Sequence, residues 1–281
     1  MREAAEYAVM LVGGDPQSSS DARGLALSGV GIRGFQVPLE VGGWEAETTK
    51  TFVLPCTVKA GFSLDAARRG IHMSRIVEFF QDRREPVVPA SLPGLLESLR
   101  ESQSSQAAEV DIAFQWFMEC RTPETEKKSW QAIGSSFHAR WDGGEGTFGY
   151  SLRVPVTTLC PCSREISDYG AHSQRGWISA RLEWAAQRGN PLPFVAAPGA
   201  VARTLVACGS APVMPLLKRA DERAVTMRAF ENPAFVEDVA RDAFLALGRT
   251  ESVNGFSIEI CNEESIHTHD AFARCARPLV R

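Results

Sequence analysis

Long hydrophobic runs are missing from this 281-residue sequence. A membrane-spanning helix needs about 20 predominantly apolar residues, and no stretch approaches that length, so we expect no membrane partner. The first apolar run, Tyr7–Val12, is short and follows acidic residues, which is not the pattern of a signal peptide. An excess of basic charge is also missing. The net charge is −4 and Lys and Arg do not cluster on one face, which argues against a nucleic-acid partner.

A disulfide framework is the third absence. The seven cysteines are an odd number and are scattered through a long chain, so they do not form the spaced pairs of a small secreted protein. We therefore expect a reducing, cytoplasmic location. Hydrophobic residues make up 44% and charged residues 23% of the chain, which is ordinary for a globular protein. The length suffices for a large core, in one domain or two.

The most informative stretch runs from Val156 to Gly176. Cys160 ends an apolar run with strand-like alternation, and Pro161 then removes a backbone donor. His172 follows twelve residues later, at the start of a second apolar run. Two strands joined by this loop would bring the thiol and the imidazole together, as a metal site or a Cys/His catalytic pair requires. The spacing by itself fits a buried thiol and a hydrogen-bonded loop histidine better, because C-x-C is not a strong zinc pattern.

The remaining segments give a coarse secondary structure. Strands are expected at 31–41, 48–60, 110–118, 130–141, 147–159, 176–186, 253–261 and 270–277. Helices are expected around 73–80, 95–99 and 199–219, and over 232–248. The last helix has Asn232 as a candidate N-cap, Pro233 in its first turn and Gly248 as a stop.

This order of elements predicts an α+β fold with two ββααββ-like modules, antiparallel sheets and helices on one face. The expected divisions are an N-terminal arm at 1–28, a first module at 29–145 and a second module at 146–281. The duplication rests on element order alone, because no residue-level repeat is evident.

Three polar clusters lie in the second half of the chain: 216–222, 237–238 and 263–270. The plainer interpretations are a solvated helix end, acids that suit a helix N-terminus, and a surface loop. Taken with Cys160 and His172, they indicate a thiolate, imidazole and carboxylate site for a divalent ion with one position open for water. Three protein ligands plus water is the catalytic zinc pattern, and it is typical of a metal-assisted hydrolase.

Segments spread over almost the whole chain match the motifs of one enzyme family. They are Asp15–Arg23, Gly31–Gly34, Arg69–Arg75, Thr158–Ser163, Gly170–Gly176, Leu217–Glu222, Glu231–Asp238 and Glu264–Asp270. On these segments the sequence resembles the type IB GTP cyclohydrolase I proteins, which belong to the tunnelling-fold (T-fold) group. The departures are Ser173 in place of Asn, Ala220 in place of Pro, and Phe230 and Phe272 where Tyr is common.

The resemblance implies hydrolysis of GTP at C8 to give 7,8-dihydroneopterin triphosphate and formate. It implies Cys160, His172 and Glu222 as ligands of one divalent ion per active site, either zinc, manganese or iron. Glu237 would hold the guanine edge, and Glu264 and His267 would transfer protons beside the ion and Cys160. Basic candidates for the triphosphate are Lys218, Arg219, Arg75 and Arg175. The implied assembly is a homotetramer of bimodular subunits, with active sites between subunits.

Three alternatives remain open. An archaeal-type relative opens the same ring but releases a cyclic phosphate product. Other T-fold enzymes act on related purines or pterins, among them nitrile reductases and carboxypterin synthases. A catalytically silent pterin-binding protein is the third, although every proposed ligand and acid–base residue is present.

Overall fold

The computed structural model describes residues 17, 19–45, 50–187, 192, 195–250 and 252–279. Most of the predicted N-terminal arm, residues 1–16 and 18, lies outside the described residues. The first strand begins at Leu27, within the arm predicted at 1–28 and four residues before the strand expected at 31–41.

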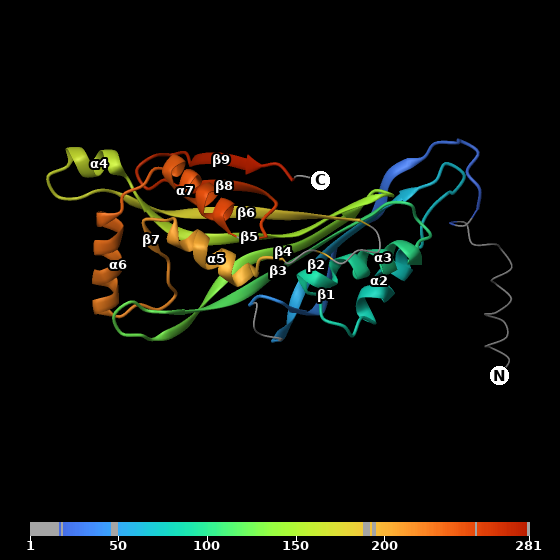
Figure 1. Cartoon of the computed structure of the whole chain (residues 1–281), viewed down its shortest axis with the longest axis horizontal. Helices are drawn as coiled ribbons and strands as arrows, with labels where there is room; N and C mark the ends of the chain where they lie inside the picture. The colour runs from blue at the N-terminus through green and yellow to red at the C-terminus, as the bar shows by residue number, and fades with distance from the viewer. Residues whose placement is uncertain are drawn as a thin grey trace.

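One continuous nine-stranded sheet runs through the described part of the chain (Figure 1). The neighbouring strands are, in order, β1 (Leu27–Gly42), β2 (Thr51–Leu64), β3 (Ala108–Arg121), β4 (Lys128–Trp141), β5 (Glu145–Leu159), β6 (Ser173–Gln187), β8 (Gly255–Glu263) and β9 (Ala271–Arg277). The short β7 (Ala211–Pro212) pairs with β5, and every strand pair is antiparallel. The expected separate sheets are thus a single sheet, because β4 and β5 pair from Gly134 with Arg153 to Trp141 with Gly146.

Helices cover one face of this sheet, as the sequence predicted. They are α2 (Met73–Gln81), the short 3-10 helix η2 (Pro89–Ser91), α3 (Leu92–Ser102), α5 (Pro198–Ala207) and α7 (Val236–Arg249). The expected leucine stripe of α3 is buried against the sheet. Strand β6 buries every second residue from Gln174 to Ala186, so one face of the strand packs under the helices.

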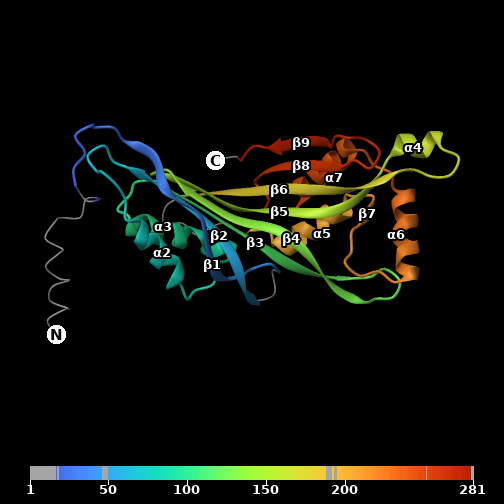
Figure 2. The same cartoon turned by 180° about the vertical axis from the view of Figure 1, so that it is seen from behind.

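The two ends of the sheet carry different helices (Figure 2). Helices α2 and α3 lie over one end, whereas α4 (Pro161–Ile166) and α6 (Arg219–Glu231) lie at the other. None of the described helices is both long and apolar enough to cross a membrane.

Three expectations about the second half were wrong. The stretch 199–219 is not one helix, because α5 ends at Ala207 and a separate helix α6 starts at Arg219. Only Asp221 and Ala229 of α6 are buried, so this helix has no apolar stripe by which a pattern search finds it. Asn232 is the C-cap of α6 rather than the N-cap of the next helix, which begins at Val236. The loop after Cys160 contains the short helix α4.

His138 is a buried histidine on the helix-free face of β4. Its side chain is 3% exposed, neither ring nitrogen has a hydrogen-bond partner, and Nε2 lies 3.9 Å from Oε1 of Glu183. Burial, with a smaller contribution from the charge of Arg181, lowers the pKa of His138 from 6.5 to about 3. The folded protein therefore holds this imidazole neutral.

We predict that acid destabilises the protein partly through His138. His138 takes up a proton below pH 6.5 in the unfolded chain but only below about pH 3 in the folded chain. The free energy of unfolding therefore falls as the pH drops from 6.5 to about 3. The loss is on the order of 4–5 kcal/mol at the acid end. Denaturant titrations at several pH values measure the free energy of unfolding. Between pH 6.5 and about 3 this free energy should fall more steeply in the wild type than in His138→Gln. Parallel pH profiles for the two proteins would contradict the assignment.

Candidate functional site

The connection between β5 and β6 brings Cys160 and His172 side by side. The backbone N–H of Cys160 donates to the carbonyl of His172 at 3.1 Å, immediately beyond the last pair of the two strands, Leu159 with Ser173. Ser163 closes the loop, since its Oγ accepts from the N–H of His172 at 3.0 Å. Gly170 has a φ of 154°, which residues with a side chain rarely adopt. The juxtaposition expected from the spacing is therefore present.

These two residues line a pocket of about 270 Å³ on the helix side of the sheet. Five of the residues singled out in the sequence meet there: Cys160, His172, Glu237, Glu264 and His267. The other lining residues are Gln174, Ala234, Phe235, Val236, Asn262, His269 and Ala271. The pocket thus combines a thiol, imidazoles and carboxylates from four segments of the chain.

The start of α7 forms one wall of this pocket. The N–H of Ala234 donates to the carbonyl of Leu159 at 3.0 Å, which ties the entry of α7 to the end of β5. The N–H of Phe235 donates to Oδ2 of Asp238 at 3.1 Å and so caps the helix. Glu237 follows in the first turn with an exposed side chain, where the helix dipole favours an anion.

The ring of His172 is held by acceptors around one nitrogen. Nδ1 lies 3.0 Å from Oε1 of Gln174, 3.4 Å from Oγ of Ser265 and 4.0 Å from Oε2 of Glu264. An amide oxygen can only accept, so the Gln174 contact places the proton on Nδ1. Nε2 of His172 then carries the lone pair that a metal ion needs.

The end of β8 and the loop after it form the opposite wall. The Glu264 side chain is 11% exposed, and its Oε2 is buried without a hydrogen-bond partner. Asn262 is 2% exposed, and its Oδ1 also lacks a partner. The rings of His267 and His269 stack with their centroids 5.2 Å apart.

Sequence reasoning missed Gln174 and Asn262. Each lies two residues from a predicted site residue, His172 and Glu264 respectively, and so shares its side of the chain. Strand alternation carried through the ends of β6 and β8 would have found both.

Helix α6 is fixed by the fully buried Asp221. Its carboxylate accepts hydrogen bonds from the N–H groups of Glu124 and Thr125, the hydroxyl of Thr125 and the N–H of Lys218, at 2.6–2.9 Å. Burial alone would raise the pKa of Asp221, but these hydrogen bonds outweigh it and hold the pKa well below its usual range. The turn between β3 and β4 therefore anchors the start of α6.

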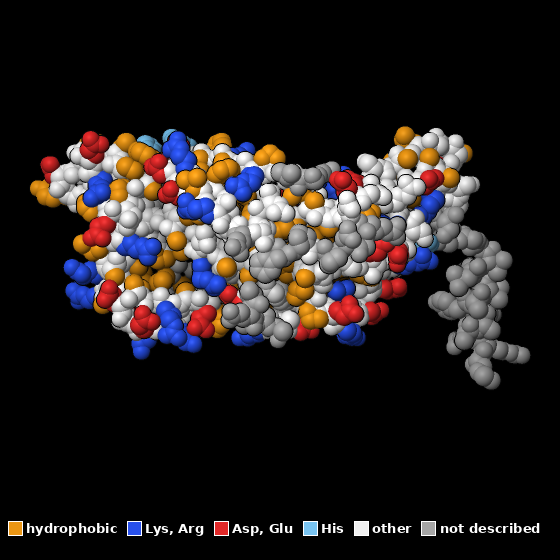
Figure 3. Space-filling view, viewed as in Figure 1, with side chains coloured by type: hydrophobic (Ala, Val, Ile, Leu, Met, Phe, Trp, Pro, Cys, Tyr) orange, Lys and Arg blue, Asp and Glu red, His pale blue; other side chains and the backbone are white. Residues whose placement is uncertain are grey.

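The charged residues at the start of α6 do not line the pocket. Lys218, Arg219 and Glu222 are exposed, and Figure 3 shows basic side chains among acids at this end of the molecule. Val225 and Ala229, on the α6 face nearest to Glu222, pack in a cluster with Leu159, Ala171 and Ala211. Glu222 thus lies about one helical turn from Val225, and Val225 packs in the same cluster as Leu159 and Ala171, the chain neighbours of Cys160 and His172.

The two remaining arginines point elsewhere. Arg175 alternates with Gln174 along β6 and is exposed on the opposite face of the sheet. Arg75 is exposed on α2, which lies at the other end of the molecule from α4, the helix that follows Cys160 (Figure 1). Within one chain, the structure does not bring these arginines to the pocket.

Cys160 and His172 fit a divalent ion by chemical type. Thiolate and imidazole are the commonest ligands of zinc, and the hydrogen bond to Gln174 leaves Nε2 free to bind. Among the described residues, however, no three His, Cys, Asp or Glu side chains are close enough to hold a metal ion as they stand. The third ligand implied by the family resemblance, Glu222, is the missing member.

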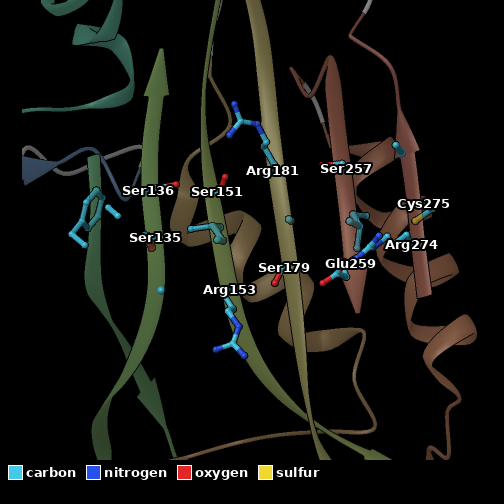
Figure 4. Close-up of a pocket in the computed structure, with 17 residues that line it drawn as sticks. Ser135, Ser136, Ser151, Arg153, Ser179, Arg181, Ser257, Glu259, Arg274 and Cys275 are labelled. Atoms are coloured by element: carbon cyan, nitrogen blue, oxygen red, sulfur yellow. Dashed lines mark hydrogen bonds and ion pairs between the residues drawn. The ribbon is translucent and has the colours of Figure 1, made fainter. Parts of the chain in front are cut away.

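A larger hollow of about 870 Å³ crosses the helix-free face of the sheet (Figure 4). Its floor is a band of serine and alanine side chains with the backbone of Gly134, and its arginines already have partners. Arg274 pairs with Glu259, and Arg181 donates to Glu183 at 2.9 Å. Arg153 lies over the ring of Trp177 at 3.7 Å. None of the predicted site residues lines this hollow, so we assign the chemistry to the smaller pocket.

Comparisons with known proteins agree with the resemblance seen in the sequence. A family model described as type I GTP cyclohydrolase folE2 matches residues 14–273. The GTP cyclohydrolase FolE2 of Geobacter sulfurreducens is 37% identical over 261 residues, covering 92% of this chain and 96% of that protein. The GTP cyclohydrolase FolE2 of Ralstonia nicotianae is 36% identical over 265 residues, covering 94% of each.

Solved structures agree on the fold. A uricase from Arthrobacter globiformis superposes with a TM-score of 0.52 at 8% identity, covering 90% of this chain and 93% of the uricase. A hyper-thermostable uricase mutant gives a TM-score of 0.54 at 9% identity, with 90% and 92% covered. These uricases have the tunnelling fold, and at this identity the likeness concerns the fold alone. By its sequence, the chain belongs to the type I GTP cyclohydrolase FolE2 family and is an enzyme.

Proposed function

We propose that this chain hydrolyses GTP at C8 to 7,8-dihydroneopterin triphosphate and formate, the first step of tetrahydrofolate and pterin synthesis. Family membership supplies GTP as the substrate. The observation that carries the residue-level proposal is the single pocket in which Cys160 and His172 meet Glu237, Glu264 and His267.

In this proposal Cys160, His172 and Glu222 hold one divalent ion, either zinc, manganese or iron. Such an ion would supply Lewis-acid chemistry and would lower the pKa of a water bound to it towards neutrality. The Cys160 thiol would bind as a thiolate, and Nε2 of His172 is the free nitrogen. Glu222 shares a face of α6 with Val225 and Ala229, which pack in the cluster with Leu159 and Ala171, the chain neighbours of Cys160 and His172, and this supports it as the third ligand.

The other pocket residues act on the substrate directly. The Glu237 carboxylate would accept two N–H groups of the guanine edge, a bidentate contact for which carboxylates are suited. Glu264 is nearly buried with one oxygen unpartnered, and His267 is exposed in the same pocket. A shielded carboxylate and an accessible imidazole form a pair able to pass protons to and from the opening purine ring.

The proposal includes assembly into a homotetramer of bimodular subunits, with modules at 29–145 and 146–281. Lys218, Arg219, Arg75 and Arg175 are the candidates for the triphosphate. Helix α2, which carries Arg75, and helix α4, which follows Cys160, lie at opposite ends of one chain, so Arg75 and the pocket contact the same GTP only if neighbouring subunits share a site. A cytoplasmic location belongs to the same proposal.

Metal-stripped protein incubated with GTP, with and without Mn²⁺, Zn²⁺ or Fe²⁺, tests the activity. We expect metal-dependent formate and a fluorescent oxidised pterin that carries a linear triphosphate. A cyclic phosphate product would favour the archaeal-type reaction, and GTP binding without formate would favour a silent binder.

We predict that Cys160→Ala and His172→Ala each abolish metal binding and turnover without unfolding the protein. Each side chain supplies one ligand atom to the metal ion, and neither residue belongs to the hydrophobic core. Metal content after dialysis, formate release and circular dichroism are the measurements. Cys162→Ala is the matched control, because this thiol is exposed and does not line the pocket. Normal turnover in the Cys160 or His172 variant would contradict their assignment as metal ligands.

Gln174→Leu should weaken metal binding by about 10–100-fold, the usual effect of removing a partner that orients a ligand histidine. The substitution keeps the side-chain size but removes the oxygen that accepts from Nδ1 of His172. Competition with a chelator measures the affinity without any need for turnover. Equal affinities in wild type and variant would show that Gln174 does not orient the ring.

Glu237→Gln should raise KM for GTP and reduce discrimination against nucleotides that lack guanine's donors. The amide offers one acceptor where the carboxylate offers two. Steady-state kinetics with GTP and inosine triphosphate measure both effects, and Asp242→Asn controls for charge loss on the same helix, because this carboxylate is exposed and does not line the pocket. Unchanged kinetics in the Glu237 variant would remove its anchoring role.

A further inference from the structure

His269 is a pocket residue to which the proposed function assigns no role. It lies in the loop 264–270 between β8 and β9, and it lines the same pocket as His267, the proposed proton carrier. The rings of the two histidines are nearly parallel, with their centroids 5.2 Å apart and their planes at 17°. Aromatic rings attract each other in such offset stacks. The two imidazoles therefore form a defined pair at the pocket.

The loop that carries this pair is fixed at both ends. At its start, Oε2 of Glu264 lies 4.0 Å from Nδ1 of His172. At its end, Ala271 begins β9, which pairs with β8. His269 stands only two residues before that strand, whereas His267 lies in the middle of the loop. The backbone thus holds His269 more closely than it holds His267.

The ring of His267 has few other restraints. Its side chain is exposed, and among the described residues neither ring nitrogen has a hydrogen-bond or ion-pair partner. An exposed side chain without such partners moves rapidly among its rotamers. A proton carrier, however, must lie within hydrogen-bond reach of the atom that it serves. The stack on His269 is the contact that limits the orientation of the His267 ring.

We propose that His269 is a positioning residue, whose ring holds the imidazole of His267 in the orientation required for proton transfer. The inference rests on the proposed function, since it takes His267 as a proton carrier during GTP hydrolysis. In this role the flat ring of His269 is required and its two nitrogens are not. His269 acts through His267 and exchanges no proton with the substrate itself.

Two substitutions of His269 separate the ring from its nitrogens. His269→Phe keeps a flat ring for the stack and should retain kcat within about 3-fold of the wild type. His269→Asn keeps hydrogen-bonding groups but loses the ring, and it should lower kcat by about 10-fold or more, since a displaced reacting group is costly. KM for GTP should change by less than about 3-fold in both variants, because the guanine contact and the metal ligands are untouched.

A double substitution tests whether His269 acts through His267. His267→Ala should lower kcat by about 100-fold or more, the usual contribution of one acid–base group. Adding His269→Asn to this variant should lower kcat no further, because the ring that it positions is already absent. Thr268→Ala is the matched control for disturbance of the loop, since Thr268 is exposed, lies between the two histidines and does not line the pocket.

A chemical role for the His269 nitrogens predicts a different result. Equal losses of kcat in His269→Phe and His269→Asn would show such a role and overturn the inference. Wild-type kcat in His269→Asn, or a rise in KM alone, would also overturn it. If the Asn variant does not fold, as judged by circular dichroism, His269→Ala takes its place with the same expected loss. Absence of formate from the wild type with every metal would overturn the proposed function, and the role of His269 with it.

Discussion

The site depends on how far β5 and β6 remain paired. The ladder runs without interruption from Glu145 with Gln187 to Leu159 with Ser173, and the backbone bond between Cys160 and His172 extends it by one step. Two residues twelve positions apart in sequence are thereby fixed by backbone geometry rather than by flexible side chains. A site built on the ends of strands is held more precisely than one built on loops alone.

Other elements reach the pocket through bonds to this same strand end. The carbonyl of Leu159 accepts from Ala234, which sets where α7 starts and so where Glu237 stands. The side chain of Leu159 packs in the cluster with Ala211 and Ala229, which places α6 alongside. One residue next to Cys160 therefore organises both helices that supply the proposed substrate and metal contacts.

Several buried polar atoms gather around this strand end. Asn262 and Glu264 line the pocket and each has one buried oxygen without a hydrogen-bond partner, and the unpartnered Oγ1 of Thr158 lies one residue before Leu159. Unsatisfied polar atoms reduce stability, by roughly 1–3 kcal/mol each where neither water nor ligand meets them. Their concentration at one place is expected of a binding site, where local stability is given up for recognition.

The fold could be predicted where buried residues recur with the spacing of a helix or a strand. The leucines of α3 and the alternation in β6 mark buried faces, so these elements were identified. Helix α6 was missed because it is held by the hydrogen bonds of Asp221 to a turn almost a hundred residues earlier, and no local pattern records such a contact. The continuity of the sheet was missed for a related reason, since pairing of β4 with β5 is invisible when each half is read alone.

The candidate site shows the same division. Cys160 and His172 could be placed together from the sequence because they flank one loop between two strands. That Glu237 and Glu264 share their pocket depends on packing between distant segments. The polar clusters indicated a mixed site, but only the resemblance to known enzymes singled out these two residues and their roles. Gln174 and Asn262 carry no motif of their own and became visible through their hydrogen bonds or the lack of them.

Anomalous X-ray diffraction at the zinc edge, from crystals grown with zinc, tests the central claim most directly. The account predicts one strong peak per chain between Sγ of Cys160 and Nε2 of His172, with a Glu222 carboxylate as third ligand. A zinc peak elsewhere, or one bound through Nδ1 of His172, would contradict it.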